Sequence, residues 1–224
     1  GAAAASEILA ESRFSEVLKK TYPDEISIAG QPVRVGVFIC HCGSNIAGTI
    51  NVQEVAEWAE DNPNVVVSRN YEFMCSSTGQ ELIENDIKEL GLTRVVVAAC
   101  SPHLHEQTFR TACERAGLNP YLVEMANLRE HCSWVHAHDR EGATAKAKDL
   151  VRMAVARSTR LEPLYEMPFE VVQKGLVIGG GLAGLTAALM LAEQGFETYI
   201  VEQSDQLGGN ARTLYYTEDG ASPA

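Results

Sequence analysis

Residues 94–100, RVVVAAC, are an almost continuous apolar run that ends in a cysteine, and they form the clearest strand signal of the chain. Residues 33–40, VRVGVFIC, have the same character, which is typical of strands buried on both faces of a parallel sheet. Two further strands are predicted at residues 65–68, with an extension toward residue 74, and at residues 119–125.

Helical spacing of apolar residues fills the gaps between these strands. The pattern predicts helices from Val52 to Ala59, from Leu82 to Leu90 and over residues 104–116, and a longer one over residues 142–159. Gly91 and Gly117 follow two of them, as expected at helix ends. Strand and helix therefore alternate from residue 33 to about 126, which predicts an α/β fold with a Rossmann-like parallel sheet.

Composition limits the classes of function. The 224 residues carry a net charge of −12, which argues against a nucleic-acid partner, because such partners need a basic face. No apolar run reaches the ~20 residues of a membrane-spanning helix, so no membrane span is predicted. The N-terminus lacks the basic region of a signal peptide, and six cysteines without such a signal favour a reducing, cytoplasmic compartment.

The pattern divides the chain into four parts. Residues 1–32 form an N-terminal extension with a weak helical pattern over residues 6–20, and residues 33–160 form the cysteine-rich α/β domain. Residues 161–170, LEPLYEMPFE, contain two prolines and are predicted to be a linker. A second unit occupies residues 171–224.

Five cysteines follow the predicted strands of the first domain: Cys40, Cys42, Cys75, Cys100 and Cys132. The carboxyl ends of parallel strands open on one edge, so these thiols can meet in one pocket and supply the four thiolates of an iron–sulfur cluster. Zinc also takes four thiolates, although its structural sites usually contain a C-x₂₋₄-C pair. The third interpretation is that each cysteine is a small buried hydrophobic residue.

The remaining cysteine and the histidines carry less information. Cys113 shares a helix face with Phe109, Ala112 and Ala116, which predicts a core position. Six histidines lie near the cysteines in the sequence, and we expect them to be neighbours of the ligands or solvated residues: His41, His103, His105, His131, His136 and His138.

The second unit begins with a dinucleotide-binding motif. Gly179, Gly181 and Gly184 fit G-x-G-x-x-G directly after a strand, and a helix and a second strand ending at Glu202 follow. The glycines permit a tight turn, close approach of a pyrophosphate and close helix packing, while Glu202 is placed to accept hydrogen bonds from ribose hydroxyls. No arginine follows the acid closely, since Gln203 and Ser204 come next, and this disfavours a 2′-phosphate. The predicted cofactor contacts also include the following neighbours: Leu182, Ala183, Gln203, Gly208 and Gly209.

The whole pattern resembles the N-terminal part of the heterodisulfide reductase A subunit family. The stretches that carry the resemblance are VGVFICHCGSNIAG, MCSSTGQ, VVVAACSPHLHE, GLNPYLVEMANLREHCSWVH and VIGGGLAGLTAALMLAEQGFETYIVE. The resemblance implies a [4Fe–4S] cluster on Cys42, Cys75, Cys100 and Cys132, with Cys40 as the alternate ligand. It also implies FAD rather than NAD on the glycine motif, because Gly208 and Gly209 resemble a glycine loop that passes close to FAD in related flavoproteins.

The family implies an electron-transfer subunit that passes electrons between FAD and [4Fe–4S] clusters, with flavin-based bifurcation as a further expectation. Expected partners are other heterodisulfide-reductase-like subunits, with a hydrogenase or a formate dehydrogenase among them. Only the first strand–helix–strand unit of a flavin domain is present, so we expect a second polypeptide to complete it, or the chain to be a fragment. Two alternatives stay open: a non-catalytic assembly or electron-wire module, and a zinc-stabilised NAD-binding domain.

Overall fold

The computed structural model describes residues 21–214, which fall into two compact units, residues 21–166 and residues 167–214. The helix expected over residues 6–20 lies outside the described residues. Residues 161–170, the expected linker, have no regular secondary structure. None of the helices described in residues 21–214 has the length and apolar character needed to cross a membrane.

The first unit is built on a parallel sheet, which confirms the predicted fold class. Its strands are β1 (Val35–Cys40), β2 (Val65–Tyr71), β3 (Arg94–Ala99) and β4 (Val123–Asn127), in the order β2-β1-β3-β4. Every neighbouring pair is parallel. All residues of β1 and β3 are buried, as their continuous apolar runs predict for central strands.

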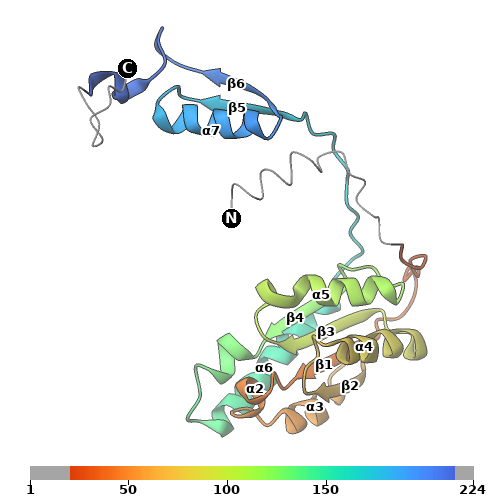
Figure 1. The fold of residues 1–224 in the computed structure, drawn as a ribbon. Coiled ribbons are helices and arrows are strands. Elements are labelled where there is room, and N and C mark those ends of the chain that lie inside the picture. The colour runs from red at the N-terminus through yellow and green to blue at the C-terminus, as the bar shows by residue number, and fades with distance from the viewer. Residues whose placement is uncertain (1–20, 215–224) are drawn as a thin grey trace. The chain divides into compact units, whose positions relative to one another are not determined.

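Helices cover both faces of this sheet (Figure 1). Helices α3 (Val52–Glu60) and α6 (Arg140–Ser158) pack on one face, and α4 (Ser77–Leu90) and α5 (Pro102–Arg115) pack on the other. Each pair closes its own apolar core against the sheet, and burial of one large side chain such as Phe109 stabilises the fold by about 2 kcal/mol. Cys113 is fully buried in the core beneath α4 and α5, as its helix face predicts.

Strand β4 begins later than the sequence predicts, because an asparagine side chain organises a turn first. Asn119 accepts the Tyr121 N–H through Oδ1 at 3.0 Å, and its Nδ2 donates to Glu25 Oε2 at 2.9 Å. Such local side-chain hydrogen bonds compete with strand pairing. The chain therefore turns at residues 119–122 and joins the sheet only at Val123.

The second unit is a strand–helix–strand unit with one bare face. Strands β5 (Lys174–Ile178) and β6 (Glu197–Val201) are parallel and are joined by α7 (Leu182–Glu193). Exposure alternates along both strands, because α7 covers only one face of the pair. The opposite face exposes four large side chains: Leu176, Ile178, Tyr199 and Val201. A short 3₁₀ helix, η2 (Gly209–Thr213), follows β6.

Candidate cofactor sites

The strand order places the cysteine-bearing loops at a topological switch point. From β1 the chain continues to α3 on one face of the sheet, and from β3 it continues to α5 on the other face. The two loops therefore diverge beyond the carboxyl ends of β1 and β3, and this switch point is where open α/β sheets bind ligands. Cys40 is the last residue of β1, and Cys100 comes directly after β3.

Cys40 lies in a cradle of backbone N–H groups. Its sulfur accepts the N–H of Cys42 at 3.3 Å and the N–H of Met74 at 3.4 Å. Burial raises the pKa of the Cys40 thiol, and the two N–H groups act in the opposite direction. A sulfur that accepts two N–H groups is prepared to carry negative charge, as a metal-bound thiolate does.

Cys42 occupies an unusual backbone conformation. Its φ is 48°, a region that residues other than glycine rarely adopt, and Gly43 follows with φ 54° before the short helix α2 (Ser44–Ala47). This turn leaves the Cys42 side chain half-buried, in contact with the cores on both faces of the sheet. Strained residues of this kind concentrate at functional sites.

Cys75 and Cys100 each precede a helix that begins at the same edge. Ser76 caps α4 by accepting the Gly79 N–H at 3.2 Å, and Ser101 precedes α5, whose first residue is Pro102. The positive end of a helix favours thiolate at such positions. Burial raises the pKa of Cys100 to about 11, while the positive charge of Arg129 lowers it.

Burial is the main cause of the raised pKa of Cys40 and of Cys100, and neighbouring thiols add to it: Cys42 and Cys75 for Cys40, and Cys42 and Cys40 for Cys100. Cys40, Cys42, Cys75 and Cys100 all lie at or just beyond the carboxyl ends of β1, β2 and β3, at one edge of the sheet. Within residues 21–214, no three side chains from His, Cys, Asp and Glu form a ready-made ligand set for one metal ion.

Cys132 is the most deeply buried of the five predicted ligands. It lies in a π-helix, η1 (Arg129–Ser133), is fully buried, and packs in the core beneath α3 and α6. Its sulfur donates to the carbonyl of Ala143 at 3.1 Å. Burial raises the pKa of Cys132, with Lys146 acting against it. In this geometry Cys132 behaves as a core residue, and its expected role as a ligand remains a prediction.

Two of the histidines near the cysteines in the sequence have other partners. His41 Nε2 lies 2.8 Å from Asn70 Oδ1, and His136 Nε2 lies 3.1 Å from Lys146 Nζ. Thiols from three loops reach this edge, and such donors suit iron–sulfur or zinc ligation.

Arg129 is a residue of this site that the sequence analysis did not single out. Its Nη1 donates to Cys42 Sγ at 3.4 Å, and its Nη2 pairs with Glu130 at 2.8 Å. The guanidinium also stacks on Trp134, 4.8 Å from the ring centroid. The only signal in the sequence is an arginine three residues before a cysteine, which does not by itself indicate a contact with Cys42.

The glycines of the second unit form a tight loop between β5 and α7. Gly179 has φ 102°, and a Cβ on Gly184 would lie 1.8 Å from the Gly179 carbonyl oxygen. Both positions therefore require glycine. A Cβ on Gly181 would meet nothing, which leaves the backbone open toward a ligand at the first turn of α7, where Leu182 and Ala183 lie.

Glu202, just after β6, is bonded to this loop. Its Oε2 accepts the Gly180 N–H at 2.6 Å, and its Oε1 accepts the Ser204 N–H at 2.9 Å. These bonds lower the pKa of Glu202 to about 2, with a smaller contribution from the backbone of Gln203. The carboxylate is thus ionised at neutral pH and retains acceptor capacity for a hydroxyl group.

Gly208 and Gly209, which follow Glu202, pack against the glycine motif. The Gly208 N–H donates to the Gly180 carbonyl at 2.7 Å, and Gly208 forms a bridge with Gly181. A Cβ on Gly209 would lie 3.0 Å from Gly181 Cα. The loop after Glu202 therefore closely approaches the glycine turn between β5 and α7.

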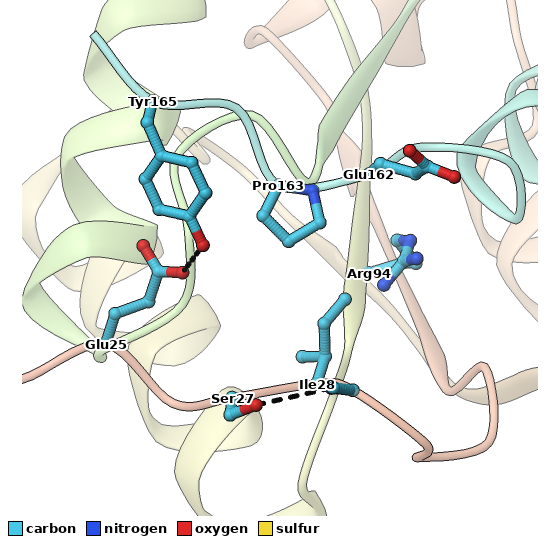
Figure 2. A pocket seen from close by; sticks show the side chains of 8 residues that line it. Glu25, Ser27, Ile28, Arg94, Glu162, Pro163 and Tyr165 are labelled. Carbon is cyan, nitrogen blue, oxygen red and sulfur yellow. Dashed lines mark hydrogen bonds between the residues drawn. The ribbon is translucent and has the colours of Figure 1, made fainter.

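A hollow of about 510 Å³ lies at the other edge of the first sheet, at the amino end of β3 (Figure 2). Arg94 lines it, but the guanidinium is already bound to the carbonyls of Thr93, Ser158 and Leu161. Across the hollow, Tyr165 donates to Glu25 at 3.1 Å. The hollow is separate from the cysteines, and its polar groups serve to fasten neighbouring segments of the chain to the sheet.

The fold and the two sites define an α/β protein with a thiol-lined sheet edge and a dinucleotide-binding unit. The NAD(P)-binding Rossmann-like domain family matches residues 177–221. An iron–sulfur A subunit of the CoB–CoM heterodisulfide reductase of Methanopyrus kandleri is 56% identical over 84% of this chain and 28% of its own length.

Two further relatives are also A subunits of heterodisulfide reductases. The A subunit of the H₂:CoB–CoM heterodisulfide,ferredoxin reductase of Methanothermobacter thermautotrophicus is 58% identical over 81% of this chain and 28% of its own length. The A subunit of the ferredoxin/F420H₂-dependent CoB–CoM heterodisulfide reductase of Methanosarcina acetivorans is 54% identical over 79% of this chain and 22% of its own. The chain belongs to the heterodisulfide reductase A subunit family, and it spans about a quarter of the length of these curated relatives.

Proposed function

We propose that this chain is the iron–sulfur and flavin-binding start of an electron-transfer subunit in a heterodisulfide-reductase-like complex of the kind found in methanogenesis. The observation that carries the proposal is the placement of four cysteines at the switch-point edge of a parallel sheet. A cluster and a flavin, when bound, supply one-electron and two-electron transfer. The cysteines and the glycine loop hold these groups and set the charge around them.

We consider two arrangements of the cluster, with either Cys40 or Cys132 as the fourth ligand. Both arrangements use Cys42, Cys75 and Cys100. We propose Cys40 as the fourth ligand, because it ends β1 at the edge where the other three cysteine-bearing loops begin and its sulfur receives two N–H groups. Cys132 can serve only if its sulfur leaves the Ala143 carbonyl and the core. The proposed site is therefore Cys40, Cys42, Cys75 and Cys100, with Cys132 as the alternative to Cys40.

FAD is the proposed cofactor of the second unit. The Gly179–Gly184 loop would receive the pyrophosphate at the start of α7, and Glu202 would accept the ribose hydroxyls. The close packing of Gly208 and Gly209 on Gly181 supports FAD, and NAD is the alternative. Release and chromatography of the bound nucleotide distinguish the two.

The bare face of β5 and β6 supports a partner in this unit. Ile178 is 83% exposed and Leu176 is 64% exposed, beside Tyr199 and Val201 on the same face. In a Rossmann domain such a face is covered by further layers, and a parallel sheet needs cover on both sides. We propose that additional polypeptide, from the same protein or from a second one, completes the flavin domain. Other heterodisulfide-reductase-like subunits, a hydrogenase or a formate dehydrogenase are the proposed electron-transfer partners.

Metal analysis of the anaerobically purified chain tests the proposal. Iron with acid-labile sulfide, together with an EPR signal that appears on reduction, is the expected result. Zinc in place of iron would support the zinc-stabilised alternative and contradict the electron-transfer function. An assembly module with a purely structural cluster would show iron but no transfer of electrons to a bound flavin.

A further inference from the structure

The arginine beside the cysteines is fixed from three sides. Arg129 begins η1, directly beyond β4, and its side chain is 16% exposed. Glu130 Oε1 accepts its Nε at 3.1 Å and its Nη2 at 2.8 Å, and the Trp134 ring lies against its outer face. The remaining arm, Nη1, points to Cys42 Sγ at 3.4 Å. A guanidinium held by a fork and a ring has little freedom, so its contact with sulfur is preorganised.

The same arginine is placed between two of the cysteine loops. It hydrogen-bonds the sulfur that follows β1, and its charge also acts on Cys100, which follows β3. Glu130 is tied back to β4 because its N–H donates to Asn127 Oδ1 at 3.0 Å. The positive charge is therefore supported by the sheet itself rather than by a mobile surface loop.

If Arg129 had only a structural role, its contacts would not affect electron transfer. Exposed ion pairs and cation–π contacts are common on protein surfaces and contribute little. Arg129 differs because one of its donors is directed at sulfur. Hydrogen bonds and positive charge at ligand sulfurs stabilise the reduced form of a cluster, which gains one negative charge per electron.

We propose that Arg129 is a positioning residue that orients Cys42 and raises the reduction potential of the cluster held at this sheet edge. The inference rests on the proposed function, because it assumes that a cluster occupies the site. Glu130 and Trp134 serve to hold the guanidinium in place.

The experiment compares reduction potentials in the full 224-residue chain after anaerobic reconstitution with iron and sulfide, followed by EPR during a redox titration. Arg129→Gln removes the positive charge. Arg129→Lys keeps the charge but lacks the forked set of N–H donors of a guanidinium. Arg110→Gln is the matched control, because Arg110 also pairs with a glutamate, Glu106, at 2.7 Å and stacks on an aromatic ring, Tyr121, at 4.8 Å.

We expect Arg129→Gln to lower the potential, with a tenfold or larger change in the reduction equilibrium, equivalent to about 59 mV for one electron. Arg129→Lys should lie between this variant and the wild type, and Arg110→Gln should match the wild type. Equal potentials in all four proteins would overturn the role of Arg129. Loss of iron from both Arg129 variants would also overturn it, because the residue would then be needed for assembly. Absence of iron from the wild-type chain would instead contradict the proposed function.

Discussion

The sulfur of Cys40 accepts the backbone N–H of Met74 at 3.4 Å, a contact between residues 34 positions apart in the chain. It fastens the end of β1 to the loop that carries Cys75 after β2. Since Cys40 also accepts the N–H of Cys42, one sulfur organises two of the three cysteine-bearing loops. The four-thiol region is therefore a product of sheet topology together with local N–H···S bonds.

The position of Cys132 predicts a mild effect of its removal. Cys132→Ala deletes a buried sulfur and its contact with the Ala143 carbonyl, so we expect a loss of about 1–2 kcal/mol in the free energy of unfolding. Iron content after reconstitution should stay near that of the wild type. A loss of most of the iron would show that Cys132, rather than Cys40, is the fourth ligand.

The glycine loop predicts different outcomes for two neighbouring substitutions. In Gly184→Ala the new Cβ would overlap the Gly179 carbonyl oxygen, so we expect a loss of about 1–3 kcal/mol in the stability of the second unit, together with loss of nucleotide binding. In Gly181→Ala the Cβ meets no atom of the protein, and we expect weaker binding with unchanged stability. Thermal unfolding and nucleotide retention measure the two effects. Equal stability losses would contradict the geometry.

The hydrogen bonds of Glu202 predict its behaviour with pH. The pKa of this carboxyl is about 2 in the folded chain, below the ordinary 4.5, because the Ser204 and Gly180 N–H groups favour the ionised form. The stabilisation it contributes is therefore complete above about pH 4.5 and is lost as the pH falls toward 2. A titration of the side-chain carboxyl by NMR checks this, with Glu202→Gln to assign the signal. A midpoint near 4.5 would rule out the bonds to Gly180 and Ser204.

A buried carboxylate on α4 and the arginine that pairs with it predict unequal effects of two substitutions. Asp86 on α4 is 4% exposed and accepts a two-pronged bond from Arg69 on β2, at 2.5 and 2.9 Å. Arg69→Met leaves this charge buried without its partner, and we expect a loss of about 3 kcal/mol. Asp86→Asn, which removes the charge itself, should cost less. Urea unfolding followed by circular dichroism measures both, and a larger loss in Asp86→Asn would contradict this interpretation.

The sequence predicts the architecture well, because continuous apolar strands and helical spacing are local signals. The runs at residues 33–40 and 94–100 become the two central strands, and the glycine motif falls between β5 and α7. The late start of β4 depends on Asn119, whose bond to Glu25 spans 94 positions and has no local signature.

The site was only partly predictable, because side-chain directions and long-range contacts leave no local signal in the sequence. Placement of cysteines after strands follows from topology, but the distinction between Cys40 and Cys132 depends on where each sulfur points. Cys132 lies on η1, whose π-helical turn directs it toward α6, and a sequence pattern does not indicate that turn. Arg129 was missed because its partner Cys42 is 87 positions away.

Replacement of Cys40 tests the account most directly. Iron and acid-labile sulfide are measured in Cys40→Ala after anaerobic reconstitution, beside Cys113→Ala, which removes a buried cysteine from the core beneath α4 and α5. We predict that Cys40→Ala loses the cluster and its EPR signal, whereas Cys113→Ala keeps both. Full iron and sulfide in Cys40→Ala, with an unchanged spectrum, would contradict the gathering of these four thiols around one cluster.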